Sequence, residues 1–376
     1  MARNFGFHMP TEVVFGEGVV DRTGEHAARL GKCALIVTGR RSARESGALG
    51  RVEASLAQAG VSSMLFDRVT ANPSIELVAQ GEEVASAAEV DLVVALGGGS
   101  AMDAGKAIAI LATNGGSAKD YFGMKTYACD PLPILAIPTT SGTGSEVTPY
   151  AVLTDMESRD KKSLASPTIF PRIALADPEL TCTMSPEITV DTGIDALTHA
   201  AESYLSNRAT PLSDELALES IRLIYGSLER ACYDGEDLGA RSTMLYASML
   251  AGMCIAQTGT TMLHSMGYPL TVFHGISHGR ANGILLPYVL AFDREATPEK
   301  MDRIAEIFGG TLDAVRGFGE KLGLSADLSL LLPDANTFEE MTDHVMAAKN
   351  LANNPRPVTR SDVEEIWQRA CSGRLG

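Results

Sequence analysis

Residues 91–106 read DLVVALGGGSAMDAGK, a short apolar run that ends in a glycine-rich turn. An apolar run of this length, bounded by turn residues, is typical of a strand buried on both faces of a parallel sheet. Glycines let the backbone approach a pyrophosphate closely, and a helix that opens after them offers free N–H groups to it. The turn matches neither GxGxxG nor the Walker A pattern, so an ordinary strand–helix turn stays open as an alternative.

The same arrangement recurs on both sides of this stretch. Residues 32–38 (KCALIVT) end at Gly39, and residues 132–137 (LPILAI) end at Pro138 and the segment TTSGTGSEVT. Helical patterns separate the runs at 50–58 and 75–88. Strand–helix alternation predicts a Rossmann-like α/β domain with a parallel sheet, whose ligands bind at the carboxyl ends of the strands. The hydroxyl-rich segment there favours a nucleotide.

The chain becomes helical after about residue 180. Ser185-Pro186 and Thr210-Pro211 are typical helix starts, and residues 241–257 predict a buried helix. We therefore expect an all-α C-terminal domain at 179–376, joined to an α/β domain at 1–178 near Asp177-Pro178.

Composition narrows the class of protein. The 376 residues include 31 Lys and Arg against 47 Asp and Glu, a net charge of -16 that argues against nucleic acid as a partner. No apolar run approaches the ~18 residues of a membrane span. Six scattered cysteines without CxxC spacing are typical of reduced thiols, so a cytoplasmic protein is expected.

The residues after the second predicted strand bear on the choice of cofactor. They are Gly39, Arg40, Arg41 and Ser42. In dinucleotide sites an acid at this place binds the ribose 2′-hydroxyl, whereas basic groups accept a 2′-phosphate. The absence of an acid and the two arginines favour NADP over NAD, with a solvated pair of surface charges as the alternative.

Four of the seven histidines fall between residues 199 and 278. Asp195 and His199 are four apart in a helical segment, so both lie on one face. His264, His274 and His278 follow, and a carboxylate with three imidazoles suits Fe(II) or Zn(II). The alternative is a helix with a few hydrogen-bonded core histidines.

Taken together, these segments resemble the iron-containing (group III) alcohol dehydrogenases. The resemblance rests on GGGS with Asp103 and Lys106, PTTSGTGSEVT at 138–148, Asp195 with His199, and His264 with His278. Asn72-Pro73, Asp177-Pro178 and Asn353-Asn354-Pro355-Arg356 also match, so the likeness runs nearly end to end. It implies a metal-dependent hydride transfer between a nicotinamide cofactor and a small primary alcohol or diol, or its aldehyde.

The resemblance also implies roles for particular residues. The metal, Fe(II) with Zn(II) possible, would be held by Asp195, His199, His264 and His278. The cofactor would contact Asn72, Gly98, Gly99, Ser100, Asp103, Thr139, Thr140, Thr143, Thr148, Lys161 and His278. Gly39 falls where NAD-using members often carry Asp, in agreement with the expected preference for NADP. A homodimer with the site in an interdomain cleft is implied as well.

One position departs from the family pattern. Many members have a second histidine four residues after the third metal ligand, where this sequence has Tyr268. We expect either Tyr268 or His274 to serve proton transfer. Three alternatives within the superfamily stay open: a glycerol dehydrogenase-like enzyme, a maleylacetate reductase-like enzyme and a dehydroquinate synthase-like lyase. A silent metal- or nucleotide-binding regulator is the alternative from another class.

Overall fold

The computed structural model describes residues 4–124, 126–158, 160–324, 328 and 338–375. Its contacts divide the chain into two compact units, and each is described by itself. We call Met9–Met184 with Gly235–Leu245 the α/β unit. We call Met1–His8, Ser185–Asp234 and Tyr246–Gly376 the helical unit.

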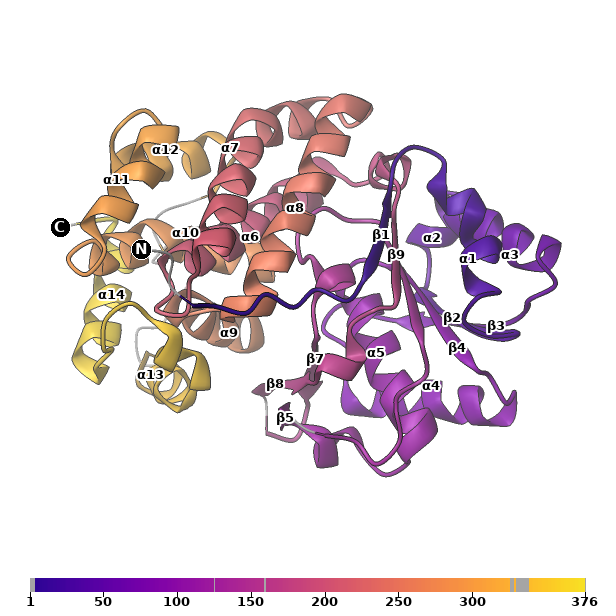
Figure 1. Cartoon of the computed structure of the whole chain (residues 1–376). Helices are drawn as coiled ribbons and strands as arrows, with labels where there is room; N and C mark the ends of the chain where they lie inside the picture. The colour runs from indigo at the N-terminus through magenta and orange to yellow at the C-terminus, as the bar shows by residue number, and fades with distance from the viewer. Residues whose placement is uncertain (1–3, 125, 159, 325–327, 329–337, 376) are drawn as a thin grey trace. The chain divides into compact units, whose positions relative to one another are not determined.

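The α/β unit is built on a six-stranded sheet in the order β1-β9-β6-β4-β2-β3, in which every pair of neighbours is parallel. Figure 1 shows this twisted sheet among its helices. The strands are β1 (Glu12–Phe15), β2 (Cys33–Gly39), β3 (Ser62–Val69), β4 (Leu92–Gly97), β6 (Ile134–Pro138) and β9 (Ile173–Ala176). The predicted parallel sheet is therefore confirmed, and its three predicted strands are β2, β4 and β6.

Helices cover both faces of this sheet because successive side chains of a strand point to opposite sides. Leu35 and Val37 of β2 pack into one core with α4 (Ile75–Ala87) and α5 (Gly99–Asn114). Ala34 and Ile36 pack into a second core with α1 (Thr23–Ala27) and α3 (Ala48–Gln58). The short α2 (Ser42–Glu45) follows β2. The ends of β2, β4 and β6, each followed by a motif of the sequence, consequently share one edge of the sheet.

A second, smaller sheet was not expected from the sequence. It consists of β5 (Gly123–Met124), β7 (Tyr150–Asp155) and β8 (Asp160–Ala165), in the order β5-β8-β7. β7 and β8 pair antiparallel, with Thr154 opposite Lys161. The two lysines and the polar turn of this hairpin obscure the period-two pattern of a strand, which explains why it was missed.

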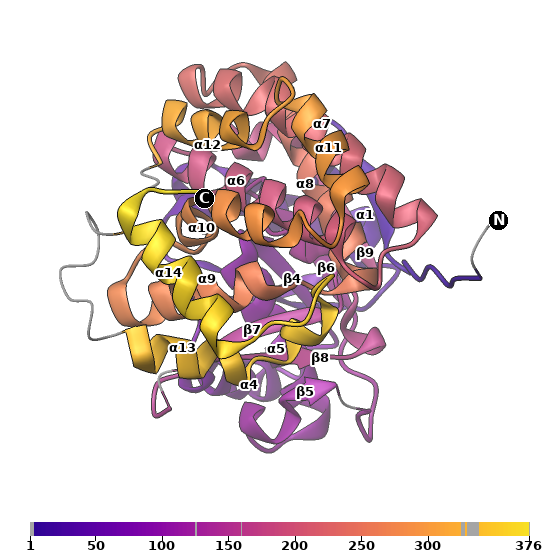
Figure 2. The same ribbon diagram turned by 90° about the vertical axis from the view of Figure 1, so that its left-hand side faces the viewer.

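The described part of the helical unit contains helices and no strand, which confirms the helical C-terminal region. Figure 2 shows these helices from a second side. They are α6 (Pro186–Leu205), α7 (Pro211–Tyr233), α9 (Met262–His274), α10 (His278–Asp293), α11 (Pro298–Ile307), α12 (Leu312–Lys321), α13 (Phe338–Ala347) and α14 (Arg360–Ser372). α8 (Leu238–Thr258) begins in the α/β unit and ends in the helical unit. Ser185 and Thr210 cap α6 and α7 through their side chains, as predicted.

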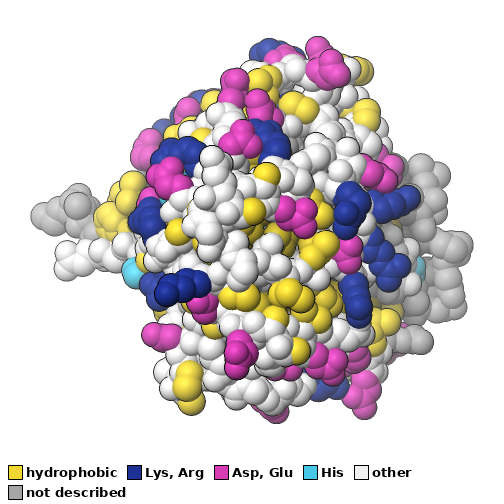
Figure 3. Space-filling model, turned by 90° about the vertical axis from the view of Figure 1, so that its right-hand side faces the viewer, with side chains coloured by type: hydrophobic (Ala, Val, Ile, Leu, Met, Phe, Trp, Pro, Cys, Tyr) yellow, Lys and Arg dark blue, Asp and Glu magenta, His cyan; other side chains and the backbone are white. Residues whose placement is uncertain are grey.

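The surface carries charges of both signs. Figure 3 shows acidic and basic side chains interspersed over one face of the molecule. Arg51, for example, pairs with Asp21 at 2.7 Å and with Glu179 at 2.9 Å. None of the helices in the described ranges has the length and apolar character that crossing a bilayer requires.

Candidate active site

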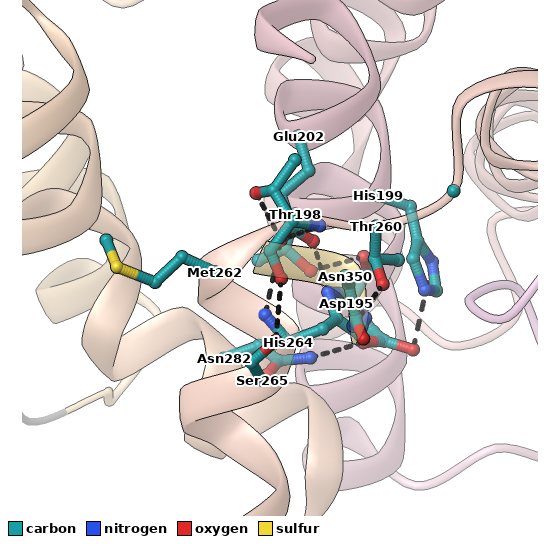
Figure 4. Close-up of polar contacts among 12 residues, drawn as sticks. Asp195, Thr198, His199, Glu202, Thr260, Met262, His264, Ser265, Asn282 and Asn350 are labelled. Atoms are coloured by element: carbon teal, nitrogen blue, oxygen red, sulfur yellow. Dashed lines mark hydrogen bonds and ion pairs between the residues drawn. The ribbon is translucent and has the colours of Figure 1, made fainter. Parts of the chain in front are cut away.

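Three predicted metal ligands form one buried group in the helical unit. Asp195 and His199 lie one turn apart on α6, and His264 lies in the first turn of α9. One ligand atom of each lies within 4.8 Å of the others, and Figure 4 shows Asp195 beside both histidines. His264 Nε2 is 3.7 Å from Asp195 Oδ1, and His199 Nδ1 is 4.0 Å from Asp195 Oδ2. A carboxylate and two imidazoles in this arrangement fit a divalent cation such as Fe(II) or Zn(II).

His278, the fourth predicted ligand, is the first residue of α10. Its Nε2 lies 3.8 Å from Asp195 Oδ1, and its side chain is 26% exposed. Asn282 follows one turn later and donates through Nδ2 to Asp195 Oδ1 at 3.1 Å. His278 is therefore close to the shared carboxylate, on the more exposed side of the group.

Close packing of three helices brings these side chains together. A Cβ added to Gly279 of α10 would lie 1.8 Å from the carbonyl oxygen of Asp191 on α6. A Cβ added to Gly267 of α9 would lie 1.9 Å from Asn282 Oδ1 on α10. Arg280 also pairs with Asp191 at 3.1 Å. The glycines thus permit an approach of α9 and α10 that larger residues would prevent.

Glu202 belongs to this group and was missed by the sequence analysis. Its Oε2 hydrogen-bonds His264 Nδ1, and its Oε1 accepts bonds from Thr261 N at 2.8 Å and Thr261 Oγ1 at 2.7 Å. A carboxylate at Nδ1 fixes the ring so that Nε2 faces Asp195, an arrangement common around metal-bound histidines. The spacing of Asp195, His199 and Glu202, at i, i+4 and i+7, could have revealed it.

The two buried carboxylates are both held in their ionised form. Burial opposes ionisation of Asp195, but the surrounding imidazoles, His199 first, outweigh burial and lower its pKa. Burial likewise opposes ionisation of Glu202, but His264 and Thr261 outweigh burial and lower its pKa. Negative charge in a buried site suits a cation.

Tyr268 and His274, the two candidates for proton transfer, lie at different positions along α9. The Tyr268 ring stacks on the His278 ring, with centroids 5.4 Å apart. His274 ends α9, and burial lowers its pKa. Among the described residues the buried Nε2 of His274 has no hydrogen-bond partner.

The glycine-rich turn of the α/β unit is packed under the hydroxyl-rich segment. Gly98 is the N-cap of α5 and supplies no side chain to the first N–H groups of the helix. A Cβ on Gly98 would lie 3.1 Å from Thr140 Oγ1, and a Cβ on Gly99 would lie 2.7 Å from Thr143 Cγ2. These predicted cofactor residues therefore lie together, with free helix N–H groups that fit a diphosphate.

Asn72 adjoins the same turn. Its backbone N–H donates to Ser100 Oγ at 3.2 Å, and its carbonyl accepts a bond from Thr154 Oγ1 at 3.3 Å. Its φ of 55° is uncommon for a residue other than glycine. Such a conformation persists where the surroundings hold it, which occurs often at ligand sites.

A buried lysine binds the C-terminal end of the hydroxyl-rich segment and the residues that follow it. Lys106 of α5 is fully buried and donates to the carbonyl oxygens of Ser145 at 2.6 Å, Thr148 at 2.9 Å and Tyr150 at 2.8 Å. Thr148 Oγ1 is itself buried and lies 3.3 Å from Lys106 Nζ. Asp103 accepts a bond from Ser145 Oγ at 3.2 Å. Burial raises the pKa of Asp103 to about 6.

The structure distinguishes the two lysines of β8. Lys162 lies 4.0 Å from Asp155 and over the Phe122 ring. The Lys161 side chain lies on the other face of β8 from that of Lys162, because neighbouring side chains of a strand alternate between faces. It is near enough to Asp103 to lower the pKa of that carboxyl, although burial raises it more. Lys161 is thus on the side of α5.

The residues after β2 lie open to solvent. Arg40 and Arg41 are exposed, and among the described residues their guanidinium groups have no partner. Ser42 opens α2. A Cβ on Gly39 would lie 3.6 Å from the Val69 carbonyl, an ordinary contact, so a side chain could be accommodated there.

Comparisons with known proteins agree with this geometry. The family model of the iron-containing alcohol dehydrogenases matches residues 10–178, and the model of the family's C-terminal region matches residues 189–371. A 1,3-propanediol dehydrogenase from Citrobacter freundii is 35% identical over 98% of this chain and 99% of its own length. An NAD-dependent methanol dehydrogenase from Bacillus methanolicus is 31% identical over 97% of this chain and 99% of its own.

A solved structure gives the same result. An iron-containing alcohol dehydrogenase from Thermotoga maritima is 41% identical and superposes with a TM-score of 0.91, covering 98% of this chain and 100% of that one. The chain belongs to the family of iron-containing alcohol dehydrogenases.

Proposed function

We propose that this protein is a metal-dependent oxidoreductase that transfers a hydride between a nicotinamide cofactor and a small primary alcohol or diol, or the corresponding aldehyde. The observation that carries the proposal is the buried group of Asp195, His199 and His264, whose ligand atoms lie within 4.8 Å of one another. The relative from Citrobacter freundii is by name a 1,3-propanediol dehydrogenase, which favours a short alcohol or diol.

Four residues would hold the metal, which we infer to be Fe(II), with Zn(II) able to replace it. They are Asp195, His199, His264 and His278. One carboxylate and three neutral imidazoles leave a site with a divalent cation net positive, which suits an oxygen that develops negative charge. Glu202 orients His264, and Asn282 holds the Asp195 carboxylate through its amide.

When bound, a divalent cation supplies a Lewis acid for the alcohol or carbonyl oxygen, and a nicotinamide supplies the hydride acceptor or donor. The protein holds the metal-ligating side chains in position before the substrate binds. Burial of the group keeps water from competing and strengthens its electrostatic interactions. The Tyr268 ring lies on His278, so we infer that its hydroxyl, rather than His274, serves proton transfer.

The cofactor would bind at the carboxyl edge of the large sheet. Gly98, Gly99 and Ser100 would bind the diphosphate at the N-terminus of α5, and Asn72 would lie near the adenosine. Asp103, Thr139, Thr140, Thr143 and Lys161 would line the remainder, together with His278. Thr148 acts through the buried contact with Lys106, which holds the shape of the segment.

We infer that NADP is preferred over NAD. Arg40 and Arg41 are exposed directly after β2, where they can receive a 2′-phosphate, and no acid stands at Gly39 to bind a 2′-hydroxyl. NAD is the competing cofactor, because the methanol dehydrogenase relative is NAD-dependent by name. The homodimer and the cytoplasmic location stay predictions.

The proposal is tested by removing the metal and restoring it. Protein treated with a chelator is assayed for aldehyde reduction with NADPH, before and after Fe(II) or Zn(II) is added without oxygen. We expect activity to be lost and then recovered, and His264→Ala to recover none. Primary alcohols, glycerol and maleylacetate are compared in the same assay. Activity that persists in the metal-free protein, or a preference for maleylacetate, would contradict the proposal.

A further inference from the structure

The motif Asn353-Asn354-Pro355-Arg356 is far from the metal group in the sequence, yet it contacts the ends of the helices that carry that group. It begins at the last residue of the 3-10 helix η8 (Lys349–Asn353) in the helical unit. Three places receive its contacts: the C-terminal end of α6, the turn at 259–262 that leads into α9, and the C-terminal end of α10. These are the helices that bear Asp195, His264 and His278.

Asn353 joins α6 to the turn before α9. Its carbonyl oxygen accepts bonds from Asn207 N at 3.0 Å and Ser206 Oγ at 3.2 Å, directly after α6. Its Nδ2 donates to the Thr260 carbonyl at 2.9 Å. Asn350 adds a bond from Nδ2 to Thr260 Oγ1 at 3.0 Å. Figure 4 shows Asn350 and Thr260 near Asp195 and His199.

Asn354 joins the same turn to α10. Its side chain is buried, and its Nδ2 donates to Asp293 Oδ1 at 2.8 Å at the end of α10. Its Oδ1 accepts a longer bond, 3.4 Å, from the backbone N–H of Met262, two residues before His264. Arg356 strengthens the attachment to α10 by donating to the Phe292 carbonyl and stacking over the Phe292 ring at 4.1 Å.

The turn at 259–262 is therefore held from two sides. Glu202 of α6 binds Thr261 and His264, and the C-terminal motif binds Thr260 and Met262. A Cβ on Gly259 would lie 2.7 Å from Asn353 Nδ2, so the motif and the turn are in close contact. Residues that orient a metal ligand without touching the metal commonly set metal affinity.

We propose that Asn353 and Asn354 are positioning residues of the metal centre, which set the place of His264 relative to α6 and α10 by binding the turn that precedes it. The inference rests on the proposed metal site. It adds that the affinity for metal depends on side chains at the C-terminal end of the chain, which supply no ligand.

The test measures the affinity of the metal-free protein for Zn(II), by competition with a coloured chelator. Asn354→Asp replaces the donor to Asp293 with an acceptor, so two buried carboxyl groups face each other. Adding Asp293→Asn to this variant restores one amide–carboxylate bond and leaves an oxygen for Met262 N. Asn353→Ala removes the bond to Thr260 and keeps the main-chain bonds to α6.

A matched control is Asn114→Asp in the α/β unit. Asn114 Nδ2 donates to the carbonyl oxygens of Ile110 at 3.1 Å and Cys129 at 3.0 Å, so this substitution also disrupts a bonded asparagine. Unfolding of each metal-free variant is followed separately, at a temperature where the variants remain folded during the titration.

We expect Asn354→Asp and Asn353→Ala to weaken Zn(II) binding by about 10-fold or more. The double variant should recover most of that loss, and Asn114→Asp should bind as the wild type does. Equal affinity of wild type, Asn354→Asp and Asn353→Ala would overturn the inference, whatever happens to stability. If the wild type and His264→Ala bind Zn(II) equally, the proposed metal site itself fails, a result distinct from failure of the positioning role alone.

Discussion

Replacement of Glu202 by Gln tests how the buried group prepares His264. The carboxylate accepts four bonds: three reach Oε1, from Thr261 N, Thr261 Oγ1 and His264 N, and His264 Nδ1 bonds Oε2. An amide has one acceptor oxygen and one donor nitrogen. If the oxygen keeps the Thr261 bonds, the NH₂ group faces His264 Nδ1 and forces the ring proton onto Nε2. Nε2 is the atom that faces Asp195, and a protonated Nε2 cannot bind a metal.

The expected loss follows from this exchange of donor and acceptor. Removing a carboxylate that orients a ligating histidine typically costs 10- to 100-fold in metal affinity, or about 1.4–2.7 kcal/mol. Glu202→Gln should therefore weaken Zn(II) binding by about this factor. Because Glu202 touches neither substrate nor cofactor in this account, activity at saturating metal should recover in part.

The measurement is chelator competition on the metal-free protein, with Glu187→Gln as the control. Glu187 lies in the first turn of the same helix and is exposed, so its replacement should leave the affinity unchanged. If Glu202→Gln binds Zn(II) within twofold of the wild type while remaining folded, the orienting role of Glu202 is refuted.

Three further predictions concern other parts of the chain. Gly39→Asp should lower the ratio of kcat/KM with NADPH to kcat/KM with NADH by about 10-fold, because an acid there repels a 2′-phosphate. An unchanged ratio would remove the basis for the NADP preference. Gly279→Ala should destabilise the protein by about 1–3 kcal/mol and lower its metal content, because the new Cβ would lie 1.8 Å from the Asp191 carbonyl oxygen. A normal metal content together with a normal denaturant midpoint would contradict the packing of α10 on α6. Burial raises the pKa of Glu146 to about 7, so the folded state keeps a proton that the unfolded chain loses near its ordinary value of 4.5. The Glu146 contribution to stability thus falls as pH rises from about 4.5 to 7. Between pH 5 and pH 8, Glu146→Gln should therefore gain stability relative to the wild type, by at most about 3 kcal/mol. A difference in the free energy of unfolding that stays constant across that range would refute the raised pKa of Glu146.

The strands and turns of the large sheet were predictable because their signals are local. Residues 91–106 carry an apolar run, a glycine turn and a helix start in direct succession, and the structure has β4 followed by α5 there. The α6 pair of Asp195 and His199 was accessible for the same reason, since a spacing of four places two side chains on one helix face. His264 and His278 come from different helices, so their ligand chemistry only suggested a metal site shared with this pair, and the family resemblance then named these two as its ligands.

The sequence analysis missed Glu202 altogether, and it named Lys106 as part of the family motif without predicting that its charge is buried. The spacing of seven from Asp195 places Glu202 on the same helix face, but by itself Glu202 looks like an ordinary solvated acid. Nothing in the spacing around Lys106 indicates that its side chain is buried. Their roles depend on tertiary partners, Thr261 and His264 for Glu202 and the carbonyl groups of residues 145–150 for Lys106. The hairpin of β7 and β8 was missed because polar side chains interrupt its alternation.

The central claim is that one divalent cation is held in the helical unit by Asp195 and the histidines around it. Anomalous diffraction at the iron absorption edge, from crystals of protein purified without oxygen and without added metal, tests this most directly. The account predicts a single peak about 2.0–2.2 Å from the ligand atoms of Asp195, His199, His264 and His278. A peak at another place, or an empty group in crystals whose dissolved protein still reduces aldehydes, would contradict it.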